Sequence, residues 1–157
     1  MDYNPQKFLD SIKDKDFWKH KPLNEMSDQE WEALCDGCGK CCLNKLEHKN
    51  KILWTNARCR FLDTQSCLCR IYEHRFEKVS DCRKVNLQYI TQESTCLPKT
   101  CAYRLLFEGK ELPSWHPLVT GDAQSTHKAF ASVRHRCIIS ETDVKDYEDH
   151  VVYWEDL

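Results

Sequence analysis

Four cysteines fall within eight consecutive residues of this chain, in the run CDGCGKCC at positions 35–42. Core packing does not require so many thiols in a stretch that also holds Gly, Asp and Lys, because free cysteines are usually buried singly. Cysteines two residues apart can wrap a loop around a metal, and Gly37 and Gly39 permit the tight turns that such a loop needs. The run therefore predicts a metal site that organises the fold around it.

More cysteines follow the run within a short stretch, so the candidate ligand set is large. The predicted metal ligands are Cys35, Cys38, Cys41, Cys42, Cys59, Cys67, Cys69, Cys82 and Cys101. One structural zinc takes about four ligands, so this set implies two centres, or one centre plus redox-active or structural thiols. The side chains of adjacent Cys41 and Cys42 diverge, which favours ligation of different centres or one ligand beside one packed thiol. Cys96 and Cys137 stand apart and are predicted to be ordinary thiols.

Thiolates select zinc, Cu(I) or iron–sulfur clusters, whereas Mg²⁺ and Ca²⁺ prefer oxygen ligands. Few histidines are spaced to join the set. We therefore expect an iron–sulfur cluster or zinc as the cofactor, with the iron–sulfur cluster slightly favoured.

The compartment decides between metal and disulfides. The chain of 157 residues starts with a segment that lacks the apolar stretch of a signal peptide, and no apolar run approaches a membrane span. We therefore expect a cytoplasmic protein without a membrane partner. A reducing cytosol disfavours structural disulfides, and the odd count of 11 cysteines does not fit full pairing.

Charge is distributed unevenly along the chain. Residues 35–86 carry 11 Lys and Arg against 6 Asp and Glu, whereas residues 137–157 carry one Lys against seven acids. Positive neighbours lower thiol pKa values and offset the charge of thiolate ligands, so the basic region fits metal ligation. A nucleic-acid surface is the competing interpretation. It is less favoured because the sequence pI is about 6.4 and no helix is densely basic.

Local patterns predict short elements around the cysteines. Helices are expected after Asn4-Pro5, from the Ser27/Glu30 capping box, from a Thr100 cap to Gly109, after an Asp122 cap, and over 143–154. Strands are expected at 52–55 and 133–139, with 59–63 continuing or pairing with the first and 115–119 an extended edge. The predicted fold is a small single α+β domain over residues 1–157. Its metal-binding region is 35–101, and 137–157 is an acidic C-terminal segment.

Several motifs together resemble the YcgN branch of the YkgJ-type cysteine-cluster family. The resemblance is carried by CDGCGKCC, Cys59-Arg60, 67–72 (CLCRIY), Arg75, Asp81-Cys82, 100–105 (TCAYRL) and 115–118 (WHPL). It covers the chain from about Phe17 to the C-terminal segment. The resemblance implies a small cytoplasmic bacterial protein described as zinc- or iron-chelating, of unassigned biochemical role. A related cysteine cluster occurs in flagellin lysine N-methylase, which keeps the iron–sulfur interpretation open.

Three functional classes remain open on sequence grounds. The first is a metal or cluster carrier. The second is a redox, radical or methyl-transfer enzyme, or its accessory subunit, although no Gly-rich cofactor turn is visible. The third is a structural zinc domain that presents a surface for binding an unknown protein partner or nucleic acid. His116, His127 and His135 could support acid–base chemistry with Asp122 and Arg134. However, His116 before Pro117 is more typical of a residue that fixes a turn.

Overall fold

The computed structural model describes residues 3–157, in which eight short α-helices and seven 3₁₀ turns accompany a three-stranded sheet. The α-helices are α1 (Pro5–Ser11), α2 (Phe17–His20), α3 (Asp28–Ala33), α4 (Arg75–Lys78), α5 (Leu87–Glu93), α6 (Ala102–Phe107), α7 (Pro117–Thr120) and α8 (Ser125–Lys128). The strands are β1 (Leu43–His48), β2 (Lys51–Arg58) and β3 (Ile139–Ser140). This confirms the predicted small α+β domain. Among the described residues, no helix is long and apolar enough to cross a membrane.

The N-terminal helices begin where the sequence predicts them. The Asn4 side chain accepts a hydrogen bond from the Lys7 amide, and Pro5 occupies the first turn of α1. Ser27 and Glu30 form the reciprocal capping box of α3. The helix α3 ends just before Cys35, so it delivers the chain directly into the cysteine run.

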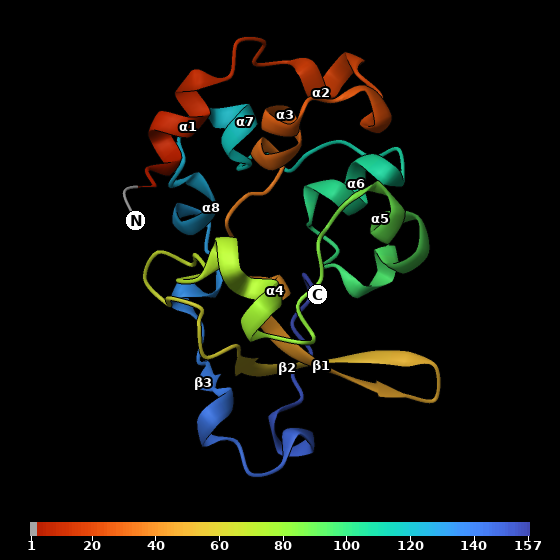
Figure 1. Cartoon of the computed structure of the whole chain (residues 1–157), viewed down its shortest axis with the longest axis vertical. Coiled ribbons are helices and arrows are strands. Elements are labelled where there is room, and N and C mark those ends of the chain that lie inside the picture. Colours follow the sequence, from red (N-terminus) through yellow and green to blue (C-terminus); the bar gives the residue numbers. More distant parts are fainter. Residues whose placement is uncertain (1–2) are drawn as a thin grey trace.

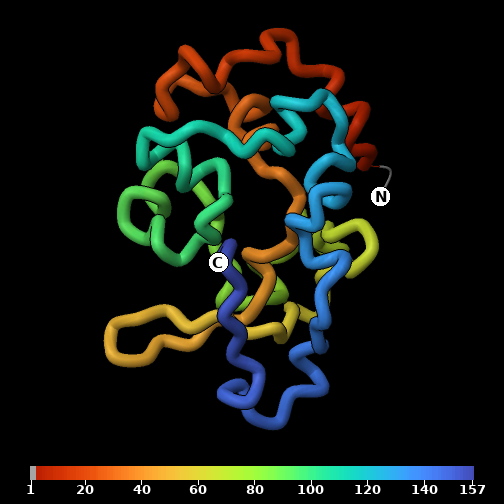
Figure 2. Tube along the Cα trace, turned by 180° about the vertical axis from the view of Figure 1, so that it is seen from behind, coloured from red at the N-terminus to blue at the C-terminus, as the bar shows by residue number. Residues whose placement is uncertain are grey.

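The sheet is built on a two-residue hairpin. Strands β1 and β2 pair antiparallel, and Lys49 and Asn50 at the turn both have positive φ, as this kind of tight turn requires. The predicted strand at 52–55 is thus confirmed within β2. Strand β3 adds a short parallel pairing through Ala57 and Ile139. The hairpin tip projects away from the body of the molecule (Figures 1 and 2).

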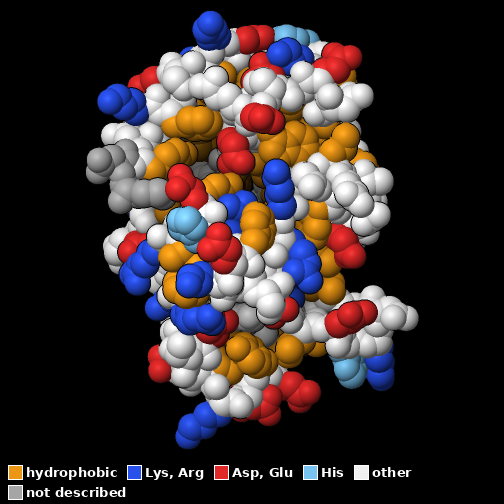
Figure 3. All heavy atoms as spheres, viewed as in Figure 1, with side chains coloured by type: hydrophobic (Ala, Val, Ile, Leu, Met, Phe, Trp, Pro, Cys, Tyr) orange, Lys and Arg blue, Asp and Glu red, His pale blue; other side chains and the backbone are white. Residues whose placement is uncertain are grey.

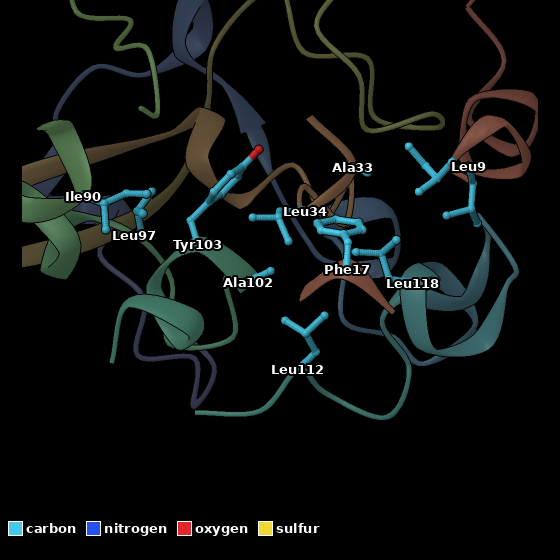
Figure 4. Close-up of a cluster of buried hydrophobic side chains, with 11 residues drawn as sticks. Leu9, Phe17, Ala33, Leu34, Ile90, Leu97, Ala102, Tyr103, Leu112 and Leu118 are labelled. Atoms are coloured by element: carbon cyan, nitrogen blue, oxygen red, sulfur yellow. The ribbon is translucent and has the colours of Figure 1, made fainter. Parts of the chain in front are cut away.

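Two hydrophobic clusters divide the interior. The first joins the N-terminal helices to α5, α6 and α7, and Figure 4 shows Phe17 between Leu34 and Leu118 within it. The second packs the sheet against the C-terminal segment, and its buried members are Leu43, Trp54, Leu62, Cys67, Val133 and Leu157. The chain from α3 to β1 runs through the middle of the molecule and connects the two clusters (Figures 1 and 2).

The C-terminal segment departs most from its prediction. Residues 143–154 form no α-helix. A 3₁₀ turn, η7 (Tyr147–His150), is followed by extended chain that bridges Thr55 through Val151. The amide of Val152 donates to the Trp54 carbonyl at 2.8 Å. Pairing with β2 satisfies this backbone, so tertiary contact replaces the amphipathic helix.

The prediction for the segment around Val133 is also wrong. The expected strand at 133–139 begins as a 3₁₀ turn, η5 (Val133–His135), with the Ser132 hydroxyl accepting from the Arg134 amide, and continues as irregular chain up to Ile139. Only Ile139 and Ser140 pair in the sheet. The polar side chains that interrupt the segment leave it too few apolar positions for a longer half-buried strand.

Three further local predictions change. The expected edge at 115–119 turns helical at Pro117, whose fixed φ suits a first helical position. Asp122 holds the turn before α8 by accepting from the Gln124 amide at 2.8 Å, and Gln124 is the N-cap. Cys101 replaces Thr100 as the N-cap of α6, while Gly109 at positive φ follows the end of that helix as predicted.

The segment after β2 does not extend that strand. Phe61 and Leu62 instead pair with the following turn, through a bridge between Leu62 and Cys69 and a 2.9 Å hydrogen bond from the Arg70 amide to the Phe61 carbonyl. This local pairing brings Cys69 back alongside the chain that carries Cys59.

Candidate metal centre

The cysteine run is held in place at the junction of the two hydrophobic clusters. Its entry is fixed by His116, whose Nε2 lies 2.8 Å from the Leu34 carbonyl oxygen. In its middle, the Cys38 carbonyl accepts from the Val133 amide at 2.9 Å. Gly37 and Gly39 have φ values of +71° and +77°. The loop therefore depends on contacts to the C-terminal half as well as on its own glycines.

Gly39 is required for a second reason, which is the space around it. A Cβ atom at this position would lie 2.9 Å from Val133 Cγ2 and 3.3 Å from Cys67 Cβ. A Cβ at Gly37 would meet nothing within 4 Å. Only the second of the two loop glycines therefore permits close packing against the sheet cluster.

Lys40 anchors the loop through a buried charge. Its side chain is 0% exposed, and its ammonium lies 2.5 Å from the Asp156 carboxylate and 3.1 Å from the Thr100 hydroxyl. Asp156 also accepts two hydrogen bonds from Arg136. Burial alone would raise the pKa of Asp156, but the hydrogen bonds from Arg136 and Lys40 outweigh burial and lower it to about 2. The C-terminal end of the chain is thus tied to the cysteine run.

One group of thiols lies on the side of the junction that faces α6, whose N-cap is Cys101. We define the inner group as Cys35, Cys41 and Cys101. Lys40 and Thr100, the residues that precede Cys41 and Cys101, are joined by a hydrogen bond of 3.1 Å. Burial raises the pKa of Cys35, and the charges of Asp36, Cys41 and Cys101 raise it further. The three thiols are therefore close enough to act on one another electrostatically.

Inner-group thiols are surrounded by protein and yet reached by solvent. Cys35 and Cys41 are exposed, whereas burial raises the pKa of Cys101 to about 12. Figure 3 shows this face of the molecule hollowed between the N-terminal helices and α4. Tyr72 reaches across from the turn before α4 and donates to the Glu32 carboxylate on α3 at 2.9 Å. A small ion or cluster could thus enter from solvent.

A second group of thiols lies on the sheet side. We define the outer group as Cys42, Cys59, Cys69 and Cys82. The amide of Cys59 donates to the Cys42 carbonyl at 2.8 Å, and Cys69 returns to this chain through its bridge with Leu62. A hydrogen bond to Cys41 and burial raise the pKa of Cys42, and the charges of Cys59 and Cys69 raise it further. Burial raises the pKa of Cys82, and the charges of Cys41, Cys69 and Cys59 add to this shift. Separate chain segments therefore bring these four thiols into the same region of the molecule, next to Cys41.

The adjacent residues Cys41 and Cys42 connect the two groups, because Cys41 belongs to the inner group and Cys42 to the outer group. A hydrogen bond from Cys42 lowers the pKa of Cys41, and the same bond raises the pKa of Cys42. Lys45 adds a positive charge that also favours the Cys41 thiolate. The predicted basic neighbourhood of the thiols is present here, with the Lys45 ammonium 4.5 Å from the centroid of the Trp54 ring.

The remaining cysteines are placed differently. Cys67 is buried in the sheet cluster, where burial raises its pKa. Burial also raises the pKa of the Cys38 thiol, whose nearby charges are Asp36, Lys40 and Cys41. Cys96 lies 3.4 Å from a Glu93 carboxylate oxygen, and Cys137 is exposed. Neither Cys96 nor Cys137 is among the charges that shift the pKa values of the inner-group thiols.

Asp36 is the unexpected member of the site. It is 7% exposed, and one carboxylate oxygen, Oδ1, accepts from the Cys38 amide at 3.0 Å. The other oxygen, Oδ2, is buried without a hydrogen-bond partner. A buried carboxylate normally pairs all its oxygens or binds a cation, so this arrangement fits a site that receives positive charge.

The thiols are neighbours without forming a closed ligand shell. Within residues 3–157, no three side chains of His, Cys, Asp or Glu converge closely enough to hold a metal ion. Sulfur must lie about 2.3 Å from zinc, so binding would draw the side chains of either group together. Metal ligands are commonly ordered by the metal itself.

The histidines have mainly structural surroundings. His116 is fully buried, accepts from the Leu118 amide at 3.0 Å as the N-cap of α7, and so fixes the turn as predicted. Burial lowers its pKa, in accord with a neutral ring. His127 is buried and bonded to Ser132 at 2.7 Å, and the ring of His135 lies 4.8 Å from that of Phe130. Sequence reasoning identified these residues but overlooked Asp36, Lys40 and Asp156.

The fold and the thiol groups define a small cysteine-rich α+β protein with its thiols gathered between two hydrophobic clusters. A UPF0260 protein of Sinorhizobium medicae is 50% identical over 141 residues, covering 88% of this chain and 90% of the relative. The UPF0260 protein YcgN of Salmonella paratyphi A is 49% identical over 143 residues, covering 90% of this chain and 95% of the relative. The chain belongs to the UPF0260 family that includes YcgN. No family model matches it, and no solved structure does.

Proposed function

We propose that this protein binds a metal centre through its clustered cysteines, as an iron–sulfur or zinc protein of the cytoplasm. The observation that carries the proposal is the presence of thiols from separate chain segments in one region, near a buried carboxylate with one unpaired oxygen. Thiols gathered only as apolar core residues would not need Asp36 among them. The nine predicted ligands, from Cys35 to Cys101, remain the proposed set, and the relation to the wider YkgJ-type family belongs to this proposal.

The chemistry of the donors supports zinc or iron. Thiolate sulfur is a soft ligand that favours Zn²⁺, Cu(I) and iron–sulfur clusters over oxygen-seeking ions. Lys45 and Arg75 place positive charge near Cys41 and Cys82 and would offset the charge of bound thiolates. An iron–sulfur cluster is slightly favoured because the number of gathered thiols exceeds the need of one zinc ion.

Among the functional classes, a carrier of metal or clusters fits the exposure of the site best. Cys35 and Cys41 are solvent-exposed, so an ion held by them could be exchanged with a partner protein. A purely structural zinc site would be expected to enclose its ligands. Nucleic acid is a less suitable partner, because the acidic segment binds the chain's own basic residues at Arg60 and Lys40.

Elemental analysis after anaerobic purification tests the proposal. We expect iron with sulfide, or zinc, in a fixed ratio to protein, and a coloured visible spectrum only for an iron–sulfur centre. Cys41→Ser should lower the metal content, whereas Cys137→Ser should leave it unchanged, because Cys137 is exposed and outside both groups. Fully folded wild-type protein that stays free of metal after anaerobic reconstitution with Fe²⁺ and sulfide, or with Zn²⁺, would contradict the proposal.

A redox function of the adjacent thiols is the second candidate, and Cys41 specifically favours it. The hydrogen bond from Cys42 and the charge of Lys45 lower the pKa of this exposed residue's thiol, which favours the thiolate form. Under this alternative, metal-free protein should react with iodoacetamide at Cys41 much faster than at Cys137. Equal alkylation rates at the two cysteines would count against it.

A further inference from the structure

The thiols do not surround one point, and the backbone explains why. Cys41 and Cys42 are consecutive, but Cys42 begins the pairing with Cys59 that leads into the sheet, whereas Lys40 ties the preceding turn to Thr100 beside Cys101. The inner group therefore belongs to the junction with α6, and the outer group belongs to the chain that follows β2. The two groups also differ in composition, since the outer group supplies four thiols and the inner group three.

The Asp36 carboxylate acts electrostatically on all three thiols of the inner group. Its Oδ2 atom is buried and lacks a hydrogen-bond partner, although the same carboxylate is held firmly by the Cys38 amide at Oδ1. The Asp36 carbonyl is also fixed, because it accepts from the Thr126 hydroxyl at 3.0 Å. Such a preorganised, unpaired carboxylate oxygen costs free energy unless a cation or donor reaches it.

We propose that the cysteines form two metal sites of different ligand chemistry, and that the Asp36 carboxylate is an oxygen ligand of the inner site with Cys35, Cys41 and Cys101. The outer site is bound by the four thiolates of Cys42, Cys59, Cys69 and Cys82. This inference rests on the metal-binding function proposed above and divides seven of its nine ligands between two sites, whereas the buried Cys38 and Cys67 belong to neither. Carboxylate oxygen bonds to zinc and iron as thiolate does, but it is harder and more readily exchanged.

Mixed ligation gives the two sites different properties. Four thiolates favour a firmly held zinc ion or cluster, whereas three thiolates and one carboxylate make a more labile site for an ion in transit. The exposure of Cys35 and Cys41 places that labile site next to solvent. The inner site is therefore the one from which a carrier would transfer metal.

Anaerobic titration of the reduced apoprotein with Co²⁺ tests the division, because cobalt–thiolate charge-transfer absorption reports the sulfur ligands. We expect about two Co²⁺ per wild-type chain. Asp36→Asn should weaken the inner ion at least about tenfold and leave the outer ion bound. Cys69→Ser should release the outer ion and leave the inner one. Asp28→Asn, on the exposed side of α3, is the matched carboxylate control and should behave like wild type.

A second variant guards against simple misfolding. Asp36→Cys should restore tight binding of the inner ion and add thiolate charge-transfer intensity, because it replaces the oxygen ligand by sulfur. Far-ultraviolet circular dichroism of each apoprotein checks that folding is retained. The inference is wrong if wild-type protein binds two ions and Asp36→Asn binds both with unchanged affinity. It is also wrong if Cys38→Ser, and not Asp36→Asn, releases the inner ion.

Failure of the proposed function has a different signature. Wild-type protein that binds neither Co²⁺ nor iron supplied with sulfide would overturn both proposals together. Binding of a single ion that is lost in both Cys69→Ser and Asp36→Asn would retain metal binding and reject the division into two sites.

Discussion

The ammonium of Lys40 lies 2.5 Å from the carboxylate of Asp156, so the middle of the cysteine run is joined to the penultimate residue of the chain. Lys40 is completely buried and Asp156 is only partly exposed. Thr100 and Arg136 complete the hydrogen bonding of the pair. The acidic segment, expected to present a solvated helix face, instead uses one carboxylate to neutralise a charge in the interior.

Removal of this carboxylate should destabilise the protein strongly. Asp156→Ala leaves the buried ammonium of Lys40 without a counter-charge, which costs about 3–5 kcal/mol when a buried pair is broken. Urea unfolding at pH 7 followed by circular dichroism measures the loss. Glu155→Ala changes the exposed neighbouring carboxylate and should alter the free energy of unfolding by less than about 0.5 kcal/mol. Similar values for the two variants would show that the ion pair has little net effect.

The same pair makes an acid-dependent contribution to stability. The pKa of Asp156 is about 2 in the folded protein, below the ordinary value of 3.8, because hydrogen bonds from Arg136 and Lys40 outweigh burial. A lowered folded-state pKa stabilises the protein above pH 4, and this stabilisation is lost as the pH falls from about 4 to about 2. The difference in free energy of unfolding between wild type and Asp156→Asn should therefore shrink across that range. A difference independent of pH would contradict the ionised state assigned to Asp156.

The two loop glycines should respond differently to a methyl group. Gly37→Ala introduces only the cost of a positive φ, about 1–2 kcal/mol, because the space around it is open. Gly39→Ala adds a clash, because its Cβ would lie 2.9 Å from Val133 Cγ2. Overpacking of this kind costs a further ~1–3 kcal/mol. Thermal or urea unfolding of both variants tests the order. Equal destabilisation would mean that Val133 moves aside without cost.

His116 should be important for stability through its two hydrogen bonds. It caps α7 at the Leu118 amide and bonds the Leu34 carbonyl just before Cys35. His116→Ala leaves both buried groups unpaired, so we expect a loss of about 2 kcal/mol or more in the free energy of unfolding. His116→Asn keeps a capping side chain and should recover part of the loss. His150→Ala serves as the control, because His150 bonds neither the Leu118 amide nor the Leu34 carbonyl.

Parts of this architecture follow from local sequence. The Asn4-Pro5 start and the Ser27/Glu30 box place α1 and α3 correctly, because capping is decided within four residues. Residues 52–55 pair as a strand because β-branched and aromatic side chains suit a sheet. The role of His116 in fixing a turn is confirmed for the same reason, since its main capping partner is two residues away.

Other parts depended on residues far apart in the chain. The C-terminal segment was expected to be helical from its apolar spacing, but Val151 and Val152 bond to β2, nearly 100 residues earlier, and local propensity cannot foresee that partner. The strand expected at 133–139 gave way to a turn for a related reason, because Val133 packs against Gly39 and the sheet cluster. The Thr100 hydroxyl, predicted to cap α6, instead accepts a hydrogen bond from the Lys40 ammonium, and Cys101 is the N-cap.

The CDGCGKCC run by itself determined that thiols would be concentrated at one place and that Gly37 and Gly39 would turn the chain there, because spacing and glycine content are local properties. Only the tertiary structure placed Cys101 near Cys41 and paired the backbone of Cys59 with that of Cys42. It also decided that Asp36 would be buried with an unpaired oxygen and that Lys40 would find Asp156. The physical reason is that burial and charge pairing depend on the segments that pack against the loop, and no local pattern specifies those segments.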